Sequence, residues 1–187
     1  RPFFAYLAFN SPHYPIVTNQ EFHGKSKAGY YGDFVIETDA MVGKVLNALK
    51  KNGFADNTLV VFSADNGPET HAFERLKEFD QWSSGKYRGV KRDIYEGGHR
   101  VPLVIQWPAG APAGRKSNQL VSLADLMATF ADLTGQNLAD HEGEESISFL
   151  ELLKGRSDHS ARQRAIYHTI NGKLAITEGD WKLIVAK

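Results

Sequence analysis

The sequence predicts an α/β fold with a largely parallel sheet, followed by a small antiparallel β subdomain. Short apolar runs that suit buried strands alternate with amphipathic segments that suit helices. The chain ends in three short strand-like segments that are separated by turn residues, and this pattern predicts the subdomain. We therefore expect an α/β core over residues 1–158 and the antiparallel subdomain over residues 159–187.

The α/β part is expected to contain three buried strands and four helices. The strands are expected at residues 3–9, 58–63 and 101–107, because each run is apolar on both faces, as in a parallel sheet covered by helices. Helical spacing of apolar residues predicts helices, of which the second and fourth are short, at residues 29–51, 72–79, 121–133 and 147–154. Gly53 and Gly135 follow the two longer helices as stop signals.

The last 29 residues predict an antiparallel sheet. Strands are expected at residues 165–168, 173–178 and 181–185, which are rich in apolar and β-branched residues. Asn171-Gly172 is a strong signal for a two-residue hairpin turn, and Glu178-Gly179-Asp180 predicts a second turn. Hairpins that follow a β-α-β region favour a separate subdomain.

Composition excludes several classes of function. The 187 residues carry 22 basic and 22 acidic side chains, and this balance argues against general nucleic-acid binding or attraction to a membrane surface. The absence of cysteine excludes disulfides, thiolate metal sites and a cysteine nucleophile within this chain. No apolar run approaches the roughly 20 residues of a membrane span. Specificity for an anion must therefore come from local charge.

Asp65 and Asn66 occupy the point where a buried strand should end. Ligands of open α/β sheets bind outside the carboxyl ends of strands. Carboxylate and amide oxygens are hard donors that suit calcium or magnesium, although two donors cannot complete a set of about 6 to 8 oxygens. An Asx turn that simply closes the strand is the alternative interpretation. The pair is thus a candidate for part of a divalent-cation site.

A basic, glycine-rich stretch covers residues 85–102, GKYRGVKRDIYEGGHRVP. It holds five basic and two acidic side chains, and its three internal glycines at 89, 97 and 98 permit close backbone approach to a ligand. Lysine and arginine in such a loop suit a phosphate or sulfate oxyanion. A solvated basic loop is the alternative. Lys91 lies in the middle of this stretch.

His13 follows the first expected strand, between two prolines in AFNSPHYP. An imidazole there could donate a proton or bind an anion, whereas a lone loop histidine is often inert. Each of the three signals lies at or near a strand end of the same expected layer. Their coincidence favours one site with a cation, an anion pocket and a proton donor.

In order along the chain, these motifs resemble those of the type I sulfatases, the arylsulfatase-like branch of the alkaline phosphatase superfamily. The resemblance rests on FNSPHYP, on DAMVGKVLNALKKNGFADNTLVVFSADNG, on YRGVKRDIYEGGHRVPLVIQWPAG, on SLADLMATFADLTG and on GDWKLI. It implies an alkaline-phosphatase-like three-layer sandwich, of which this chain would form the C-terminal part. It also implies a secreted or periplasmic enzyme that hydrolyses small-molecule or carbohydrate sulfate esters.

The resemblance assigns roles to four residues. Asp65 and Asn66 would be ligands of the divalent cation, usually calcium in this family. Lys91 would bind the sulfate and help to neutralise the leaving oxygen, and His13 would act as proton donor. Residues 96–100, EGGHR, would shape the pocket wall, with Arg100 in structural ion pairs.

Three parts of the family site are not found in this sequence. The family's nucleophile is a formylglycine made from Cys or Ser in a Cys/Ser-x-Pro/Ala-x-Arg motif, its cation site is completed by paired aspartates, and it has a second lysine and histidine pair. All would precede residue 1, so this chain by itself is expected to be inactive. A phosphonate or phosphate-ester hydrolase of the same superfamily and a non-catalytic sulfatase-like binding module are the alternatives. The sequence indicates neither the natural substrate nor the oligomeric state.

Overall fold

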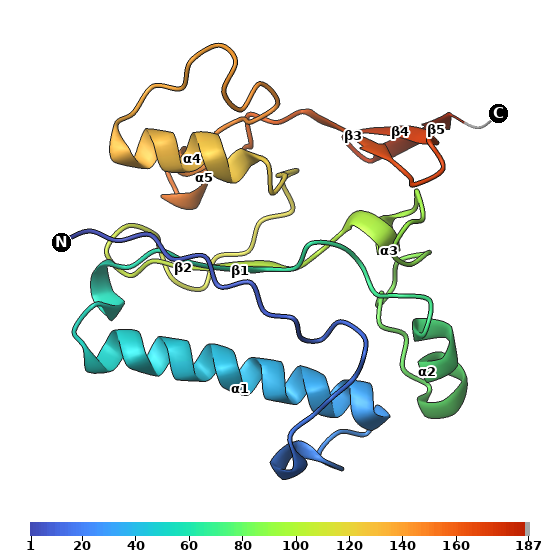
Figure 1. The fold of residues 1–187 in the computed structure, drawn as a ribbon. Helices are drawn as coiled ribbons and strands as arrows, with labels where there is room; N and C mark the ends of the chain where they lie inside the picture. Colours follow the sequence, from blue (N-terminus) through green and yellow to red (C-terminus); the bar gives the residue numbers. More distant parts are fainter. Residues whose placement is uncertain (186–187) are drawn as a thin grey trace. The chain divides into compact units, whose positions relative to one another are not determined.

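The computed structural model describes residues 1–185, which fold as two compact units (Figure 1). The first unit comprises residues 1–55 and 68–86, and the second comprises residues 56–67 together with the chain from Tyr87 onward. The elements in chain order are η1 (Gln20–Phe22), α1 (Gly29–Lys51), η2 (Ala55–Asn57), β1 (Val60–Ser63), α2 (Ala72–Phe79), α3 (Glu96–His99), β2 (Leu103–Gln106), α4 (Asp125–Thr134), α5 (Leu150–Leu153), β3 (Arg164–His168), β4 (Leu174–Glu178) and β5 (Trp181–Val185). The domain division after residue 158 stays a prediction.

The long helix α1 has the bounds that its sequence predicts. It ends in a Schellman motif, because Gly53 takes φ 74° and donates its N–H to the Lys50 carbonyl at 3.1 Å. The Phe54 N–H group donates to the Leu49 carbonyl at 2.9 Å, which completes the motif. The predicted stop signal at Gly53 is therefore confirmed. In the part of the chain that the structure describes, no helix has the length and hydropathy to span a membrane.

Two buried carboxylates on α1 hold the loop that follows the His13 motif. Asp33 is 2% exposed and accepts hydrogen bonds from the Gly24 and Ser26 N–H groups at 2.8 and 2.7 Å. Burial by itself raises the pKa of Asp33, but these backbone donors outweigh it and leave the pKa lowered. One turn later, Glu37 accepts from both the backbone and the side chain of Asn19. The inward face of α1 is thus more polar than its helical spacing predicted.

The apolar segment 3–9 was predicted to be a buried strand, and that prediction is wrong. Among residues 1–185 this segment forms no strand, and its aromatic side chains include Phe4 at 77% and Tyr6 at 82% exposure. Phe3 packs edge-on against Phe54, with ring centroids 5.8 Å apart. The apolar run indicates a tendency to be buried, but a strand also needs a hydrogen-bonding neighbour.

Strands β1 and β2 pair antiparallel, so the expected parallel pairing is wrong for these two strands. Val60 lies opposite Gln106, and Ser63 lies opposite Leu103. Side chains of β2 alternate between half-buried and exposed, with Val104 60% exposed. An apolar run indicates burial but does not specify strand direction, and one face of this pair is open. The α/β class itself is confirmed.

The C-terminal sheet has the predicted antiparallel order β3-β4-β5. The predicted turn over residues 178–180 is confirmed, and its two loop residues are Gly179, with φ 55°, and Asp180. The other hairpin has a three-residue loop instead, because Thr169 and Lys173 still pair through a 2.9 Å backbone hydrogen bond. Gly172 ends that loop with φ 74°, as is usual for this longer hairpin type.

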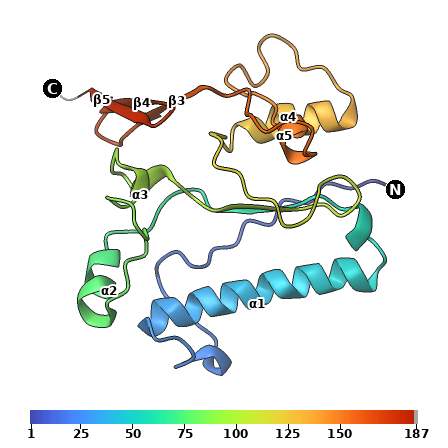
Figure 2. The same ribbon diagram turned by 180° about the vertical axis from the view of Figure 1, so that it is seen from behind.

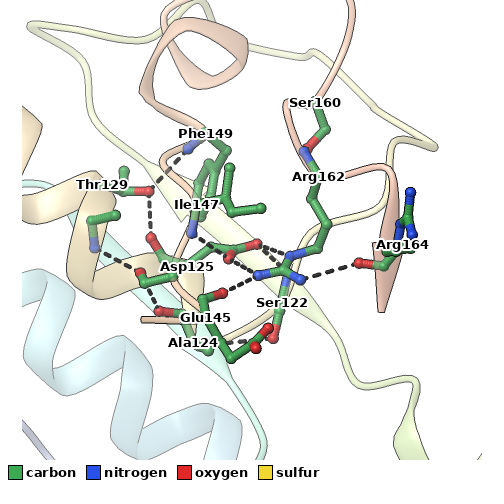
Figure 3. A network of polar contacts seen from close by, with 12 residues as sticks. Ser122, Ala124, Asp125, Thr129, Glu145, Ile147, Phe149, Ser160, Arg162 and Arg164 are labelled. Atoms are coloured by element: carbon green, nitrogen blue, oxygen red, sulfur yellow. Dashed lines mark hydrogen bonds and ion pairs between the residues drawn. The ribbon is translucent and has the colours of Figure 1, made fainter. Parts of the chain in front are cut away.

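Helices α4 and α5 lie side by side in the second unit, in both views (Figures 1 and 2). Asp125, the first residue of α4, forms a buried ion pair with Arg162 with N–O distances of 2.6 and 2.8 Å (Figure 3). Asp125 also accepts from the Ser122 and Ile147 N–H groups. The Arg162 guanidinium further donates to the Arg164 carbonyl. The pair therefore links α4, the following loop and the start of β3, a role that no sequence motif indicated.

Candidate functional site

A tight turn in the second unit presents Lys91. The Asp93 N–H group donates to the Val90 carbonyl at 3.0 Å and closes a β-turn with Lys91 as its first central residue. Arg92, the second central residue, has φ 77°, as a type II turn requires there. The Asp93 carboxylate also accepts from the Val90 N–H group at 2.9 Å. The half-buried Lys91 is therefore carried by a well-fixed backbone.

Glycines join the Lys91 turn to the strand end that carries the candidate cation ligands. The Gly97 N–H group donates to the Arg88 carbonyl at 2.8 Å, and the Gly67 N–H group donates to the Gly98 carbonyl at 3.0 Å. A Cβ on Gly67 would lie 1.8 Å from the Gly97 oxygen, and a Cβ on Gly97 would lie 2.1 Å from the Gly89 oxygen. Because only hydrogen fits at these contacts, the three backbone segments are in direct contact.

The backbone contacts of Gly67 with Gly97 and Gly98 are called the glycine joint. Asp65 and Asn66 immediately precede Gly67. Asp65 is exposed and Asn66 is half-buried. The Asn66 amide nitrogen donates to the Gly67 carbonyl at 2.9 Å, which leaves its Oδ1 atom available as a ligand oxygen. Within residues 1–185 no group of three or more His, Asp or Glu side chains could hold a metal ion. The donor chemistry of the pair thus fits a hard cation, as part of a ligand set.

The close approach at Gly67 makes a stability prediction. Gly67→Ala should destabilise the protein by about 1–3 kcal/mol, because its methyl group would collide with backbone rather than with a flexible side chain. Gly43→Ala is the matched control, since a Cβ there meets no atom within 4 Å and α1 should gain roughly 0.5–1 kcal/mol. Thermal unfolding of both variants checks the opposite signs, and equal stability of Gly67→Ala and the parent would contradict the contact.

His13 belongs to the first unit and is exposed. Its Nδ1 atom lies 2.6 Å from the Tyr14 carbonyl oxygen. Because a carbonyl oxygen only accepts, Nδ1 carries a hydrogen, and Nε2 is the ring atom left for a ligand. The Tyr14 ring stacks flat on His71, with centroids 4.8 Å apart. Since Asp65, Asn66 and Lys91 belong to the other unit, the convergence of His13 with them stays a prediction.

The EGGHR segment forms α3 and makes ion pairs. Glu96 accepts from Arg100 Nε and from Lys182 Nζ, both at 2.9 Å. Burial raises the pKa of Glu96, but the hydrogen bonds from Lys182 and Arg100 outweigh it and leave the pKa lowered. The expected structural pairing of Arg100 is confirmed. Lys182 was not among the residues predicted from the sequence. The alternation of side chains along the strand Trp181–Val185 places this lysine on the less exposed face, which was an available signal.

His99 is half-buried beside the same sheet. Its ring lies 5.0 Å from the Tyr167 ring, and its Nε2 atom is buried with no hydrogen-bond partner among the described residues. Burial, reinforced by the positive charge of Lys182, lowers the pKa of His99. We therefore expect a neutral imidazole at this position, with a role in packing.

The fold and this site define an α/β protein with paired hard oxygen donors and a lysine on contiguous turns, which are suited to an anionic ester. The chain belongs to the sulfatase family, whose family model, described as Sulfatase, matches residues 1–136. It is 35% identical over 189 residues to an N-acetylgalactosamine-6-O-sulfatase of Bacteroides thetaiotaomicron, an alignment that covers 98% of this chain and 36% of that protein.

Two solved structures have the same fold. One, from work on the metabolism of multiple glycosaminoglycans by Bacteroides thetaiotaomicron, has a TM-score of 0.84 at 34% identity and covers 95% of this chain and 37% of its own. The other, a protein in complex with its substrate D-glucosamine-2-N,6-O-disulfate, has a TM-score of 0.66 at 28% identity and covers 82% of this chain and 30% of its own. The chain therefore spans about a third of the length of these relatives.

Proposed function

We propose that the complete protein containing this chain hydrolyses sulfate esters, with calcium as its divalent cation and a formylglycine nucleophile. The observation that carries the proposal is the glycine joint in a member of the sulfatase family. Through this joint, the backbone segment that follows Asp65 and Asn66 contacts the segment that follows the Lys91 turn. The formylglycine and the remaining cation ligands would come from parts of the protein that precede this segment. Together they would supply the nucleophile and positive charge at the sulfate oxygens.

The residues of this chain would contribute binding and charge. Asp65 and Asn66 would hold the cation through carboxylate and amide oxygens. Lys91 would place its ammonium group against a non-bridging sulfate oxygen, where negative charge must be neutralised. His13 has Nδ1–H committed to the Tyr14 carbonyl, so Nε2 is the ring atom that would face the leaving oxygen, and it would donate a proton there in the imidazolium form.

We propose a carbohydrate sulfate as the substrate class. Support comes from the relative named an N-acetylgalactosamine-6-O-sulfatase and from the solved structure with a disulfated glucosamine, both described above. A sulfated polysaccharide would be met outside the cytoplasm, so we also propose a periplasmic or secreted protein. The test is turnover of sulfated sugars, with the corresponding phosphate esters as the competing class.

The cation assignment has its own test. In the complete protein, Asp65→Ala should abolish calcium-dependent turnover and weaken calcium binding at least about tenfold, since it removes a charged ligand. Asp132→Ala is the control, because it removes an exposed carboxylate from α4 and should leave both measurements unchanged. Calcium affinity is measured by calorimetry and turnover by release of sulfate. Parental calcium affinity in Asp65→Ala would rule out this ligand.

A further inference from the structure

The strongest polar cluster near the candidate site centres on Glu96. It receives Lys182 Nζ and Arg100 Nε at 2.9 Å, one on each carboxylate oxygen. Lys182 is 15% exposed and Glu96 is 28% exposed, so both charges are partly withdrawn from water. The Lys182 ammonium also lies 4.4 Å from the centroid of the Tyr167 ring, within cation–π range. Lys182 is therefore held from two sides.

The sheet places Lys182 on its inward face. In β5, Trp181 and Leu183 are 83% and 65% exposed, whereas Lys182 between them points to the other face. On that face its register partner is Thr177, and the neighbouring Ala175 is 2% exposed. A strand that exposes its apolar side chains and directs a lysine inward gives that lysine a specific partner. The partner is Glu96, in a segment 86 residues earlier in the chain.

Glu96 begins the helix that contacts the candidate site. Figures 1 and 2 both show α3 next to the sheet β3-β4-β5. The next two residues, Gly97 and Gly98, make the backbone contacts with Arg88 and Gly67 that join the Lys91 turn to the cation-ligand segment. The Lys182–Glu96 ion pair therefore holds the first residue of α3. The backbone of this helix contacts both the Lys91 turn and the cation-ligand segment.

We propose that Lys182 is a positioning residue for the sulfatase site, which it supports by holding Glu96 and, through Glu96, the Gly97–Gly98 contact with Gly67. The inference rests on the proposed function. Lys182 does not touch substrate or cation in this arrangement, because its ammonium group is engaged by Glu96 and Tyr167. Its loss would leave Glu96 with Arg100 alone and would free α3 to shift against the turns that carry Lys91 and Asp65.

The test uses the complete protein and the variants Lys182→Met, Lys182→Arg and Lys173→Met. Partners that orient metal ligands typically contribute about 10- to 100-fold to affinity or activity. We expect Lys182→Met to raise the calcium Kd about tenfold and to lower kcat by roughly 10- to 100-fold on a sulfated sugar, with a smaller change in KM. Lys182→Arg should restore most of the loss. Lys173→Met removes an exposed lysine that directly precedes β4 and should resemble the parent.

Calcium affinity separates positioning from a purely structural role. Thermal unfolding in EDTA gives the stability of each variant without the cation, and kinetic values are referred to the folded fraction. If Lys182→Met loses stability but its folded molecules keep the parental calcium Kd and kcat, the inference is overturned. If Lys182→Met does not fold, Glu96→Gln takes its place, with the same expected changes and the same overturning result. A parent that neither binds calcium nor releases sulfate would instead overturn the proposed function.

Discussion

Lys91→Ala should lower kcat of the complete protein on sulfate esters by about 100- to 1,000-fold. The reason is electrostatic: a fixed positive charge aimed at developing negative charge contributes most in the transition state, and removal of one such group typically costs this much. The type II turn at Val90–Asp93 supports this expectation, because it fixes the lysine before substrate arrives. Steady-state turnover of a sulfated sugar and of a small aryl sulfate measures the change. We expect kcat to fall by a similar factor on both substrates, because the sulfate group is common to them.

Two variants control this result. Lys86→Ala removes an exposed lysine from the same basic stretch and should retain turnover within about threefold, as expected for a screened surface charge. Lys91→Arg keeps the charge but changes the shape of the head group, so we expect partial activity. Parental kcat in Lys91→Ala would remove Lys91 from the site, whatever the behaviour of Asp65.

Features set by local sequence could be predicted well. The bounds of α1 follow from helical spacing and the Gly53 stop, and the turn at Gly179-Asp180 follows from its turn residues. Features set by distant partners could not. The direction of β1 relative to β2 depends on the path of the long intervening segment, and the exposed run at residues 3–9 forms no strand among residues 1–185. An apolar run occurs both in a paired strand and in an exposed segment, so apolar character alone does not distinguish the two.

The candidate site shows the same limit. Asp65, Asn66 and Lys91 could be named from residue type and resemblance, and the glycines at 89, 97 and 98 could be identified as points where the backbone can approach a ligand closely. The contact of Gly67 with Gly97 and Gly98 could not be predicted. The sequences of two glycine-bearing segments about thirty residues apart do not indicate which of their backbone atoms meet. Lys182 lies further still from the motif that it contacts. His13 stays a prediction, since its unit is separate.

Arg162→Met should destabilise the second unit by about 3–5 kcal/mol, because it leaves Asp125 as a buried carboxylate without its guanidinium. The side chains of Arg162 and Asp125 are only 7% and 1% exposed. The hydrogen bond from Arg162 to Asp125 raises the pKa of the guanidinium, whereas burial opposes the increase. Hydrogen–deuterium exchange measures the effect locally. The Ser122 and Ile147 amides, which donate to Asp125, should lose protection most.

A second substitution distinguishes loss of a charge partner from loss of packing. Asp125→Asn in the Arg162→Met background removes the isolated buried charge and keeps an acceptor oxygen for one of the two backbone donors, Ser122 or Ile147. The double variant should therefore be more stable than Arg162→Met alone. Arg156→Met supplies the matched control, since its pair with Glu151 is 65% and 58% exposed and should contribute about 1 kcal/mol or less. If Arg162→Met were as mild as Arg156→Met, the buried pair would not hold α4 to the start of β3.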